Sequence, residues 1–211
     1  MRLADEFFLI AWDTTSSGAP LLHIQATSLG LAGALLGELT LLERITVRGA
    51  EIRVAHRESV DDRLAQSVLD EMNAAPEHAD VRTWLAYLAQ NSVEAVAARL
   101  GHAGLVEREE SRLLWRKHVR YVATDYTEAA WPAGRVEAML VEGRRLTPAD
   151  MALVALLEAT GLLDAVVANP RSRRAARRYR ATLTATTPPP LRDLASHVQA
   201  AVGDSVLSYR S

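Results

Sequence analysis

The chain of 211 residues is 49% hydrophobic and 24% charged, which is typical of a globular protein with a sizeable core. Its formal net charge of −2 gives no global positive field, so any attraction to nucleic acid or anionic lipid must be local. The absence of cysteine excludes disulfides, thiolate metal sites and cysteine nucleophiles, and it fits a reducing compartment.

The first segment does not resemble a membrane-targeting sequence. Acidic residues stand where a secretory signal would be basic, and the apolar run from Phe7 to Trp12 is too short for a signal core or a membrane span. We therefore expect a cytoplasmic protein that is soluble unless it docks on the cytoplasmic face of a membrane.

A long apolar helix is predicted after a turn of small polar residues at 13–18. From Thr27 or Ser28, either of which is a good N-cap, leucines recur at helical spacing up to Glu43 and Arg44. Because this helix is apolar nearly all round, we expect it at the centre of the fold.

A short β-hairpin and three helices are predicted next. Residues alternate between apolar and polar on both sides of Gly49, which predicts strands at 45–48 and 51–54. N-caps and helix breakers then predict helices from Asp61 or Asp62 to Met72, from Asp80 to Ala89, and from the capping-box pattern Asn91–Glu94 to Gly104.

The C-terminal half is predicted to contain one more hairpin and then helices. β-Branched, aromatic and charged residues mix without helical period over 105–121, which predicts a hairpin with arms near 105–106 and 113–115. Helices are expected from Pro132 to Gly143, from the cap Thr147-Pro148-Ala149-Asp150 onward, over the arginine-rich segment 171–184, and after the prolines at 188–190. The fold class is thus a compact, mainly α, multi-helix globular domain with short β-hairpins, and we expect 1–211 to form a single domain.

The sequence contains no recognisable catalytic constellation. Its six histidines stand singly, without a His-Glu-x-x-His pair, and there is no glycine-rich phosphate loop or nucleophile elbow. We therefore expect no enzymatic activity, no cofactor and no metal.

Several short motifs resemble, in order, those of the Golgi phosphoprotein 3 family. They are the helix start Gly30-Leu31-Ala32-Gly33, the following Leu36-Gly37-Glu38-Leu39, the segment 81–84, the helix end at 100–106 and the apolar helix at 151–163. The resemblance implies a largely helical fold with no known catalytic activity. It also implies binding of phosphatidylinositol 4-phosphate, a phosphoinositide, on a cytoplasmic membrane face, through a basic and aromatic pocket beside a hairpin with an apolar tip.

The positions that align with this lipid-headgroup pocket are His23, Ala32, Gln90 and Val93. The family's tryptophan and arginines are absent from them. Because charge-assisted hydrogen bonds are about twice as strong as neutral ones, we expect this pocket to have lost most of its headgroup specificity.

Two local segments could contact an anionic membrane. The second hairpin combines apolar and basic residues at Leu113, Leu114, Trp115, Arg116, Lys117 and Arg120. Tryptophan prefers the membrane interface and basic residues are attracted to anionic lipid, but the same pattern suits an ordinary hairpin with one buried and one solvated face. The other segment is a basic patch, Arg171, Arg173, Arg174, Arg177, Arg178 and Arg180, which either binds an anionic partner or is solvated or paired within the protein.

These observations favour a non-enzymatic, phosphoinositide-binding type of peripheral membrane protein whose partner is an anionic lipid surface. A protein-interaction adaptor or homo-oligomeric scaffold remains an alternative. Three helices followed by a hairpin also match a winged-helix DNA-binding module, but the third helix, 92–100, offers one arginine and no Asn, Gln or Lys to read DNA. Nucleic acid is therefore not an expected partner.

Overall fold

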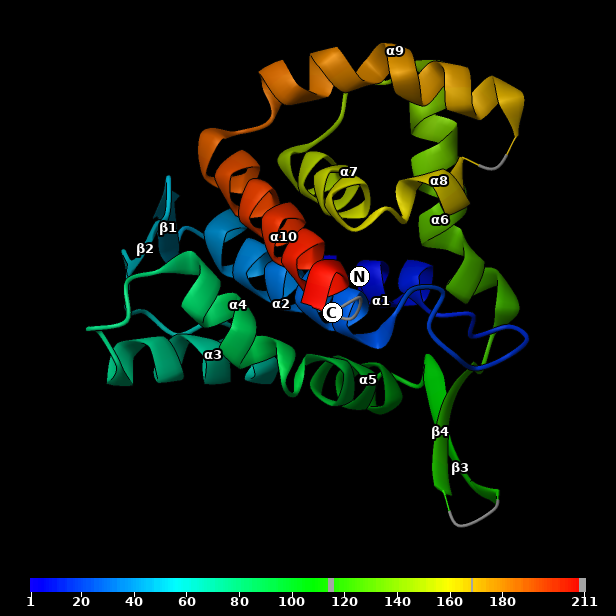
Figure 1. Cartoon of the computed structure of the whole chain (residues 1–211), viewed down its shortest axis with the longest axis horizontal. Helices are drawn as coiled ribbons and strands as arrows, with labels where there is room; N and C mark the ends of the chain where they lie inside the picture. The colour runs from blue at the N-terminus through cyan, green and yellow to red at the C-terminus, as the bar shows by residue number, and fades with distance from the viewer. Residues whose placement is uncertain (114–115, 168, 209–211) are drawn as a thin grey trace.

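The computed structural model describes the backbone of residues 1–113, 116–167 and 169–208, and their side chains except at 111–113, 116–118, 179, 181, 183, 184 and 206–208. Over this part of the chain the fold is mainly α-helical, as predicted, with ten helices and two small antiparallel sheets. The helices gather around one central helix, and a long hairpin extends away from the body (Figure 1).

The central helix is α2, Ile24–Leu41. By length and composition it could cross a membrane, since its mean hydropathy is 1.2, but 72% of it is buried inside the fold. It packs against α1 (Leu3–Ala11), α3 (Arg63–Ala74), α4 (Val81–Ala89), α5 (Ser92–His102), α7 (Pro148–Thr160) and α10 (Pro189–Ser208). This confirms the central position predicted from its all-round apolar sequence.

The predicted N-cap of α2 was four to five residues too late. The N-cap is His23, whose ring nitrogen accepts the N–H of Gln25, and Thr27 already lies inside the helix. The hydroxyl of Thr27 donates to the carbonyl of His23, so it bonds back to the first turn instead of capping it. Serine and threonine occur both at the N-cap and one turn into a helix, where the hydroxyl bonds back to a carbonyl. The sequence alone does not distinguish the two positions, which explains the error.

The caps of the next helices are as predicted except at α5. Asp62 and Asp80 each accept a backbone N–H in the first turn of α3 and α4. Asn91 precedes α5 but makes no side-chain cap bond, so the expected capping box does not form. The Ser92 hydroxyl donates instead to the carbonyl of Ser28 and ties α5 to α2.

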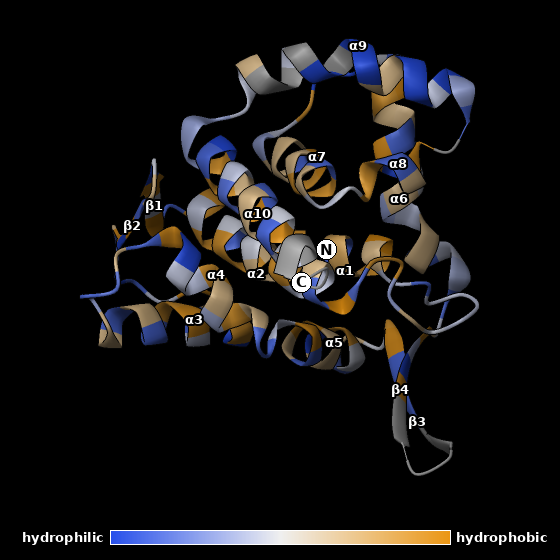
Figure 2. Ribbon diagram, in the orientation of Figure 1, coloured by the Kyte–Doolittle hydropathy of each residue, from blue (hydrophilic) through white to orange (hydrophobic). Residues whose placement is uncertain are grey.

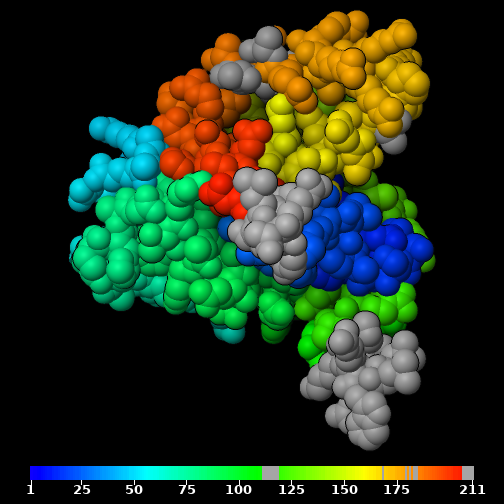
Figure 3. Space-filling view, viewed as in Figure 1, coloured from blue at the N-terminus to red at the C-terminus, as the bar shows by residue number. Residues whose placement is uncertain are grey.

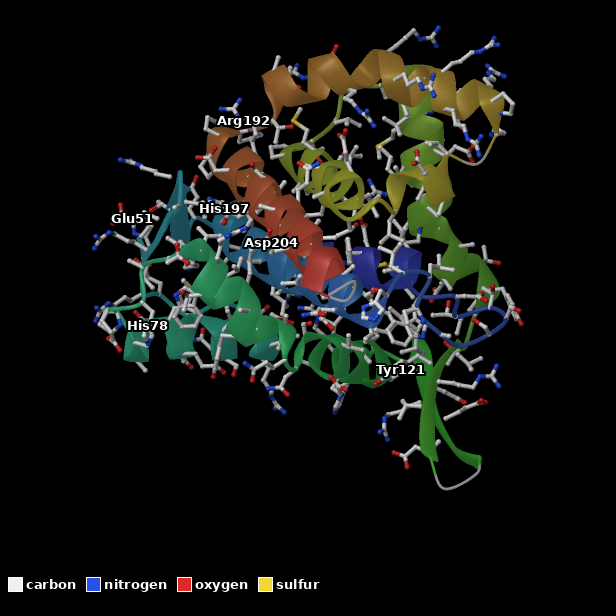
Figure 4. The ribbon with its side chains drawn as sticks, viewed as in Figure 1. Glu51, His78, Tyr121, Arg192, His197 and Asp204 are labelled. Carbon is white, nitrogen blue, oxygen red and sulfur yellow. The ribbon has the colours of Figure 1, made fainter. Side chains whose placement is uncertain are left out.

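The first hairpin is confirmed as β1 (Ile45–Arg48) paired with β2 (Glu51–Val54). Helix α10 holds its turn through two hydrogen bonds: Gly49 N–H donates to Asp193, 2.8 Å away, and the ring of His197 donates to the Gly49 carbonyl, 2.9 Å away. Figure 4 shows His197 on the side of α10 that faces this hairpin.

The second hairpin is longer than predicted, with β3 at Val106–Leu113 and β4 at Arg116–Ala123. The predicted second arm at 113–115 is wrong, because β3 continues to Leu113 and the returning strand begins only at Arg116. The loop at 13–20 lies beside β4, and the carbonyls of Gly18 and Thr14 accept the N–H groups of Tyr121 and Ala123. These long-range bonds hold the C-terminal end of β4, which the local sequence did not reveal.

The C-terminal helices are α6 (Tyr126–Glu142), α7, the short α8 (Leu163–Val166), α9 (Pro170–Thr186) and α10. Pro132 was expected at the first position of α6 but lies inside it. The true N-cap is Asp125, whose carboxylate accepts the N–H groups of Thr127 and Glu128 and starts the helix earlier. The predicted capping box of α7 is confirmed, with Thr147 and Asp150 bonded reciprocally.

Candidate functional site

The positions that the resemblance assigns to a headgroup pocket do not share one environment. His23 and Gln90 are exposed, whereas Ala32 is 0% and Val93 is 5% exposed. Ala32 and Val93 are packed in the core, so only His23 and Gln90 present a side chain to a ligand. Neither is a permanent cation.

A cavity of about 540 Å³ lies between α5 and the base of the second hairpin. Val106 and Tyr121 form part of its lining, and burial raises the pKa of the Tyr121 phenol, which therefore stays neutral at physiological pH. Its carboxylate is Glu94 and its arginine is Arg108, which forms an ion pair with Glu110. This balance of charges does not build a strongly cationic anion site.

The second hairpin extends farther from the helical body than any other element (Figure 1), and Figure 3 shows the body ending near its base. The apolar and aromatic residues Leu114 and Trp115 lie outside the described residues, as do the side chains of Leu113, Arg116 and Lys117. Their proposed contact with a membrane stays a prediction.

The register of the hairpin separates its charges along its length. Near the body, Glu109 is the partner of Arg120, so opposite charges face each other across the strands. Toward the far end, Arg112 is the partner of Lys117 and Leu113 that of Arg116. Like charges at one register position repel, so the far end is a cationic segment without an acidic residue of its own in the register.

Arg120 was grouped with the membrane-contact residues, and the structure places it at the base of the hairpin. Its guanidinium donates to the carbonyls of Ser17 and Ser16, 2.8 and 2.9 Å away. The hydroxyl of Tyr126 donates to Thr15 in the same loop. Arg120 thus helps to hold the loop at 13–20 against β4.

The predicted basic patch lies on α9, and all six of its arginines are exposed. Arg173 donates to the Val167 carbonyl, and Arg180 pairs with Glu158 at 2.5 Å. Figure 2 shows hydrophilic residues concentrated in the first half of α9, at the edge of the molecule. The two basic segments singled out from the sequence are therefore on different elements, and the structure does not bring them together.

Sequence reasoning missed a buried ion cluster centred on Arg99 of α5. Its guanidinium donates to Asp5 at 2.8 Å, to both carboxylate oxygens of Glu38 at 2.9 and 3.0 Å, and to Asp62 at 3.1 Å. Arg2 also pairs with Asp62. The cluster joins α1, α2, α5 and the cap of α3, and the signal for it was a single glutamate, Glu38, in an otherwise apolar helix.

Burial and pairing act in opposite directions on this cluster. Burial raises the pKa of Glu38 above its usual value, and hydrogen bonds from Arg99 and from the Ala4 N–H only partly offset this. Burial alone would lower the pKa of Arg99, but Glu38, Asp5 and Asp62 outweigh it and raise that pKa, so Arg99 stays charged. Arg99 is the one arginine of α5, and its commitment here leaves that helix without a cation for reading DNA.

A second ion cluster links α1 to the C-terminal helices. Arg135 of α6 pairs with Glu6 of α1 and with Asp150 of α7. Burial would raise the pKa of Asp150, but hydrogen bonds from Thr147 and the charge of Arg135 outweigh it and hold that pKa below its usual value. Adjacent acids, Asp5 and Glu6, thus attach α1 to opposite sides of the fold.

Both clusters join helices through arginine–carboxylate ion pairs. Within the described residues, no group of three or more histidine, aspartate or glutamate side chains is arranged to hold a metal ion. The basic residues of the second hairpin and of α9 can contact charged partners at the surface. Among the described residues of these sites, no nucleophile lies beside a base.

The model of the family described as Golgi phosphoprotein 3 (GPP34) matches residues 3–203, which is nearly the whole chain. A search of curated proteins found no match.

Proposed function

Because the chain belongs to the Golgi phosphoprotein 3 family, which is not a known enzyme family, we propose that it is a non-enzymatic peripheral membrane protein that docks on anionic lipid surfaces. The contact is the far end of the β3–β4 hairpin. The observation that carries this proposal is the hairpin itself, which extends from the body and has Arg112, Arg116 and Lys117 at the end away from the helices.

The charge separation along the hairpin supports this orientation. Arg112, Arg116 and Lys117 come together in the register, while the hairpin's acids, among them Glu107 and Glu109, pair nearer the body. Each basic residue close to an anionic membrane contributes about 1 kcal/mol of attraction. Trp115, between these basic residues in the sequence, supplies the side chain that prefers the interface.

Headgroup selectivity is weak in this proposal. Two of the four aligned pocket positions are buried apolar residues, Ala32 and Val93, and the cavity beside the hairpin balances Arg108 with acids. Binding then depends on surface charge density rather than on one phosphoinositide, so it weakens as salt shortens the Debye length to about 8 Å.

The test is co-sedimentation with phosphatidylserine vesicles at low and physiological salt. Trp115→Ala removes interfacial apolar area, which costs on the order of 1–3 kcal/mol of docking at about 25 cal/mol per Å². The double change Arg116→Ala and Lys117→Ala costs about 2 kcal/mol at low salt and less at high salt.

Matched controls separate the hairpin from general effects. Trp131→Ala removes a 60% exposed indole from α6, and Arg48→Ala with Arg57→Ala removes two exposed charges from another surface. The proposal fails if these controls weaken docking as much as the hairpin variants, or if binding ignores salt and demands one phosphoinositide. Circular dichroism and the melting temperature identify a variant that weakens docking by unfolding.

A further inference from the structure

Helix α9 is the most basic element of the described structure. Its 17 residues, PRSRRAARRYRATLTAT, include six arginines and no acidic residue. Since the whole chain has a formal charge of −2, removing these six positive charges leaves −8 on the rest. The molecule is therefore electrically divided between one cationic helix and an acidic remainder.

The inner face of α9 is narrow and fixed to the body. Ser172, Ala175 and Ala176 are buried, and their spacing of three and four places them on one side of the helix, which packs on α6. Asn169 caps the helix by accepting the N–H groups of Arg171 and Ser172. This attachment leaves Arg171, Arg174, Arg177 and Arg178 on the side of the helix opposite the buried residues. Figure 4 shows nitrogen-tipped side chains extending outward from α9.

Four of these arginines have no counter-charge in the described part of the chain. Arg173 and Arg180 have the partners given above, whereas no ion pair or hydrogen bond engages the guanidinium groups of Arg171, Arg174, Arg177 and Arg178 among the described residues. Like charges three and four positions apart repel each other and destabilise a helix. Arg99 and Arg135 differ sharply, because each is surrounded by carboxylates.

The position of α9 separates it from the hairpin. Figures 1 and 3 show α9 along one edge of the molecule and the β3–β4 hairpin extending from the opposite end. This step rests on the proposed function, in which the hairpin docks on a membrane. A flat membrane at the hairpin end of the molecule leaves α9 facing away from the lipid.

The chemistry of α9 selects among anionic partners. Its described exposed side chains are proline, arginine, threonine and alanine, without the exposed tryptophan, phenylalanine or leucine that anchors a helix in a membrane interface. A long nucleic acid would extend beyond this short patch and meet the acidic remainder of the molecule. A short acidic peptide contacts only the patch, where carboxylates form charge-assisted hydrogen bonds with arginine.

We infer that α9 is a docking surface for a short acidic segment of a partner protein, bound through Arg171, Arg174, Arg177 and Arg178 on the side of the molecule that faces away from the membrane. The protein then links a membrane to an acidic partner. The two contacts use different elements, so each can be removed without the other.

The first experiment measures binding of a fluorescently labelled eight-residue glutamate peptide by anisotropy. The triple change Arg174→Gln, Arg177→Gln and Arg178→Gln should weaken binding about tenfold, since each exposed ion pair contributes roughly a factor of two to three. The matched control is Arg48→Gln, Arg57→Gln and Arg63→Gln, which removes the same charge from other exposed positions and should leave binding nearly unchanged. Unchanged melting temperatures show that the variants are folded.

The second experiment asks whether both contacts form together. Phosphatidylserine vesicles repel the glutamate peptide, so the peptide should sediment with vesicles only when the protein is present, and not with the α9 triple variant. If the protein itself does not sediment, the proposed membrane function fails while the anisotropy result still stands.

Three results overturn the inference. The first is equal binding of the glutamate peptide by the wild type and the α9 variant, or an equal loss in the control. The second is α9-dependent binding of a single-stranded DNA oligonucleotide of the same charge that exceeds peptide binding, which would assign the surface to nucleic acid. The third is loss of vesicle binding in the α9 variant, which would place α9 on the membrane.

Discussion

Arg99 shows how one buried side chain organises several helices. It is 13% exposed and hydrogen-bonds to Asp5, Glu38 and Asp62, which come from three other parts of the chain. A buried ion pair is not strongly stabilising in itself, but removing one partner leaves the others buried without compensation.

We therefore expect Arg99→Ala to lower the free energy of unfolding by about 3–5 kcal/mol. The control is Arg82→Ala, which breaks a largely exposed pair with Asp204 and should cost about 0–1 kcal/mol. Urea unfolding followed by far-UV circular dichroism measures both. Equal losses in the two variants would show that the cluster is solvated in solution.

The second prediction concerns Asp150, whose pKa is held below its usual value by Thr147 and Arg135. Between the folded pKa and the unfolded value near 3.8, the unfolded chain binds more protons, so stability rises with pH across this window. The stability that the lowered pKa of Asp150 contributes is fully present above about pH 4, and it is lost as the pH falls through the folded pKa. Asp150→Asn should therefore lose less stability than the wild type on acidification from pH 5 to pH 2.5, as measured by urea unfolding. If the variant and the wild type depended on pH in the same way, the ion pair of Asp150 with Arg135 would not persist in solution.

At the scale of elements, glycines on α2 allow its neighbours to approach closely. A Cβ added at Gly30 would lie 2.2 Å from the ring of Phe7 in α1, and one at Gly33 would lie 2.5 Å from Val198 in α10. The pair of glycines in the helix start Gly30-Leu31-Ala32-Gly33 is thus explained by helix packing. It needs no contact with a ligand.

Gly30→Ala should destabilise the protein, because overpacking costs about 1–3 kcal/mol or more. Its gain in helix propensity is only about 1 kcal/mol. Gly134 on α6 is the control, since a Cβ there meets nothing within 4 Å, and Gly134→Ala should stabilise by about 0.4–1 kcal/mol. Melting temperatures of the two variants should shift in opposite directions. A stabilised Gly30→Ala variant would contradict the close approach of α1 to α2.

At the scale of the whole molecule, one connected hydrophobic core includes residues from Leu3 in α1 to Val198 in α10. The ion clusters of Arg99 and Arg135 attach both sides of this core to α1. These contacts favour a cooperative unit, and the single domain at 1–211 stays a prediction that unfolding can test.

Unfolding by urea should therefore give the same midpoint by far-UV circular dichroism and by tryptophan fluorescence, which reports on the buried Trp12 and Trp84. Arg99→Ala should shift both midpoints together. Two separate transitions would instead divide the chain into independently stable parts.

The sequence alone predicted much of the secondary structure, because its signals are local. The carboxylates of Asp62 and Asp80 and the reciprocal bonds of Thr147 and Asp150 act within one turn of their own helices. The same locality explains the errors at Thr27 and Pro132. A threonine or a proline is compatible with more than one position in a helix, and residues outside the motif decided between them.

By itself, the sequence determined the mainly helical class, the central apolar helix, the family resemblance and the basic character of the segment at 171–180. Only the tertiary structure decided where these features lie. Arg99 and Asp5 are 94 residues apart, and β4 meets a loop about 100 residues earlier in the chain, so no local pattern indicates either contact. The structure also placed the cationic hairpin end and α9 on opposite sides, because position in space depends on how the helices pack around α2 and not on the composition of either segment.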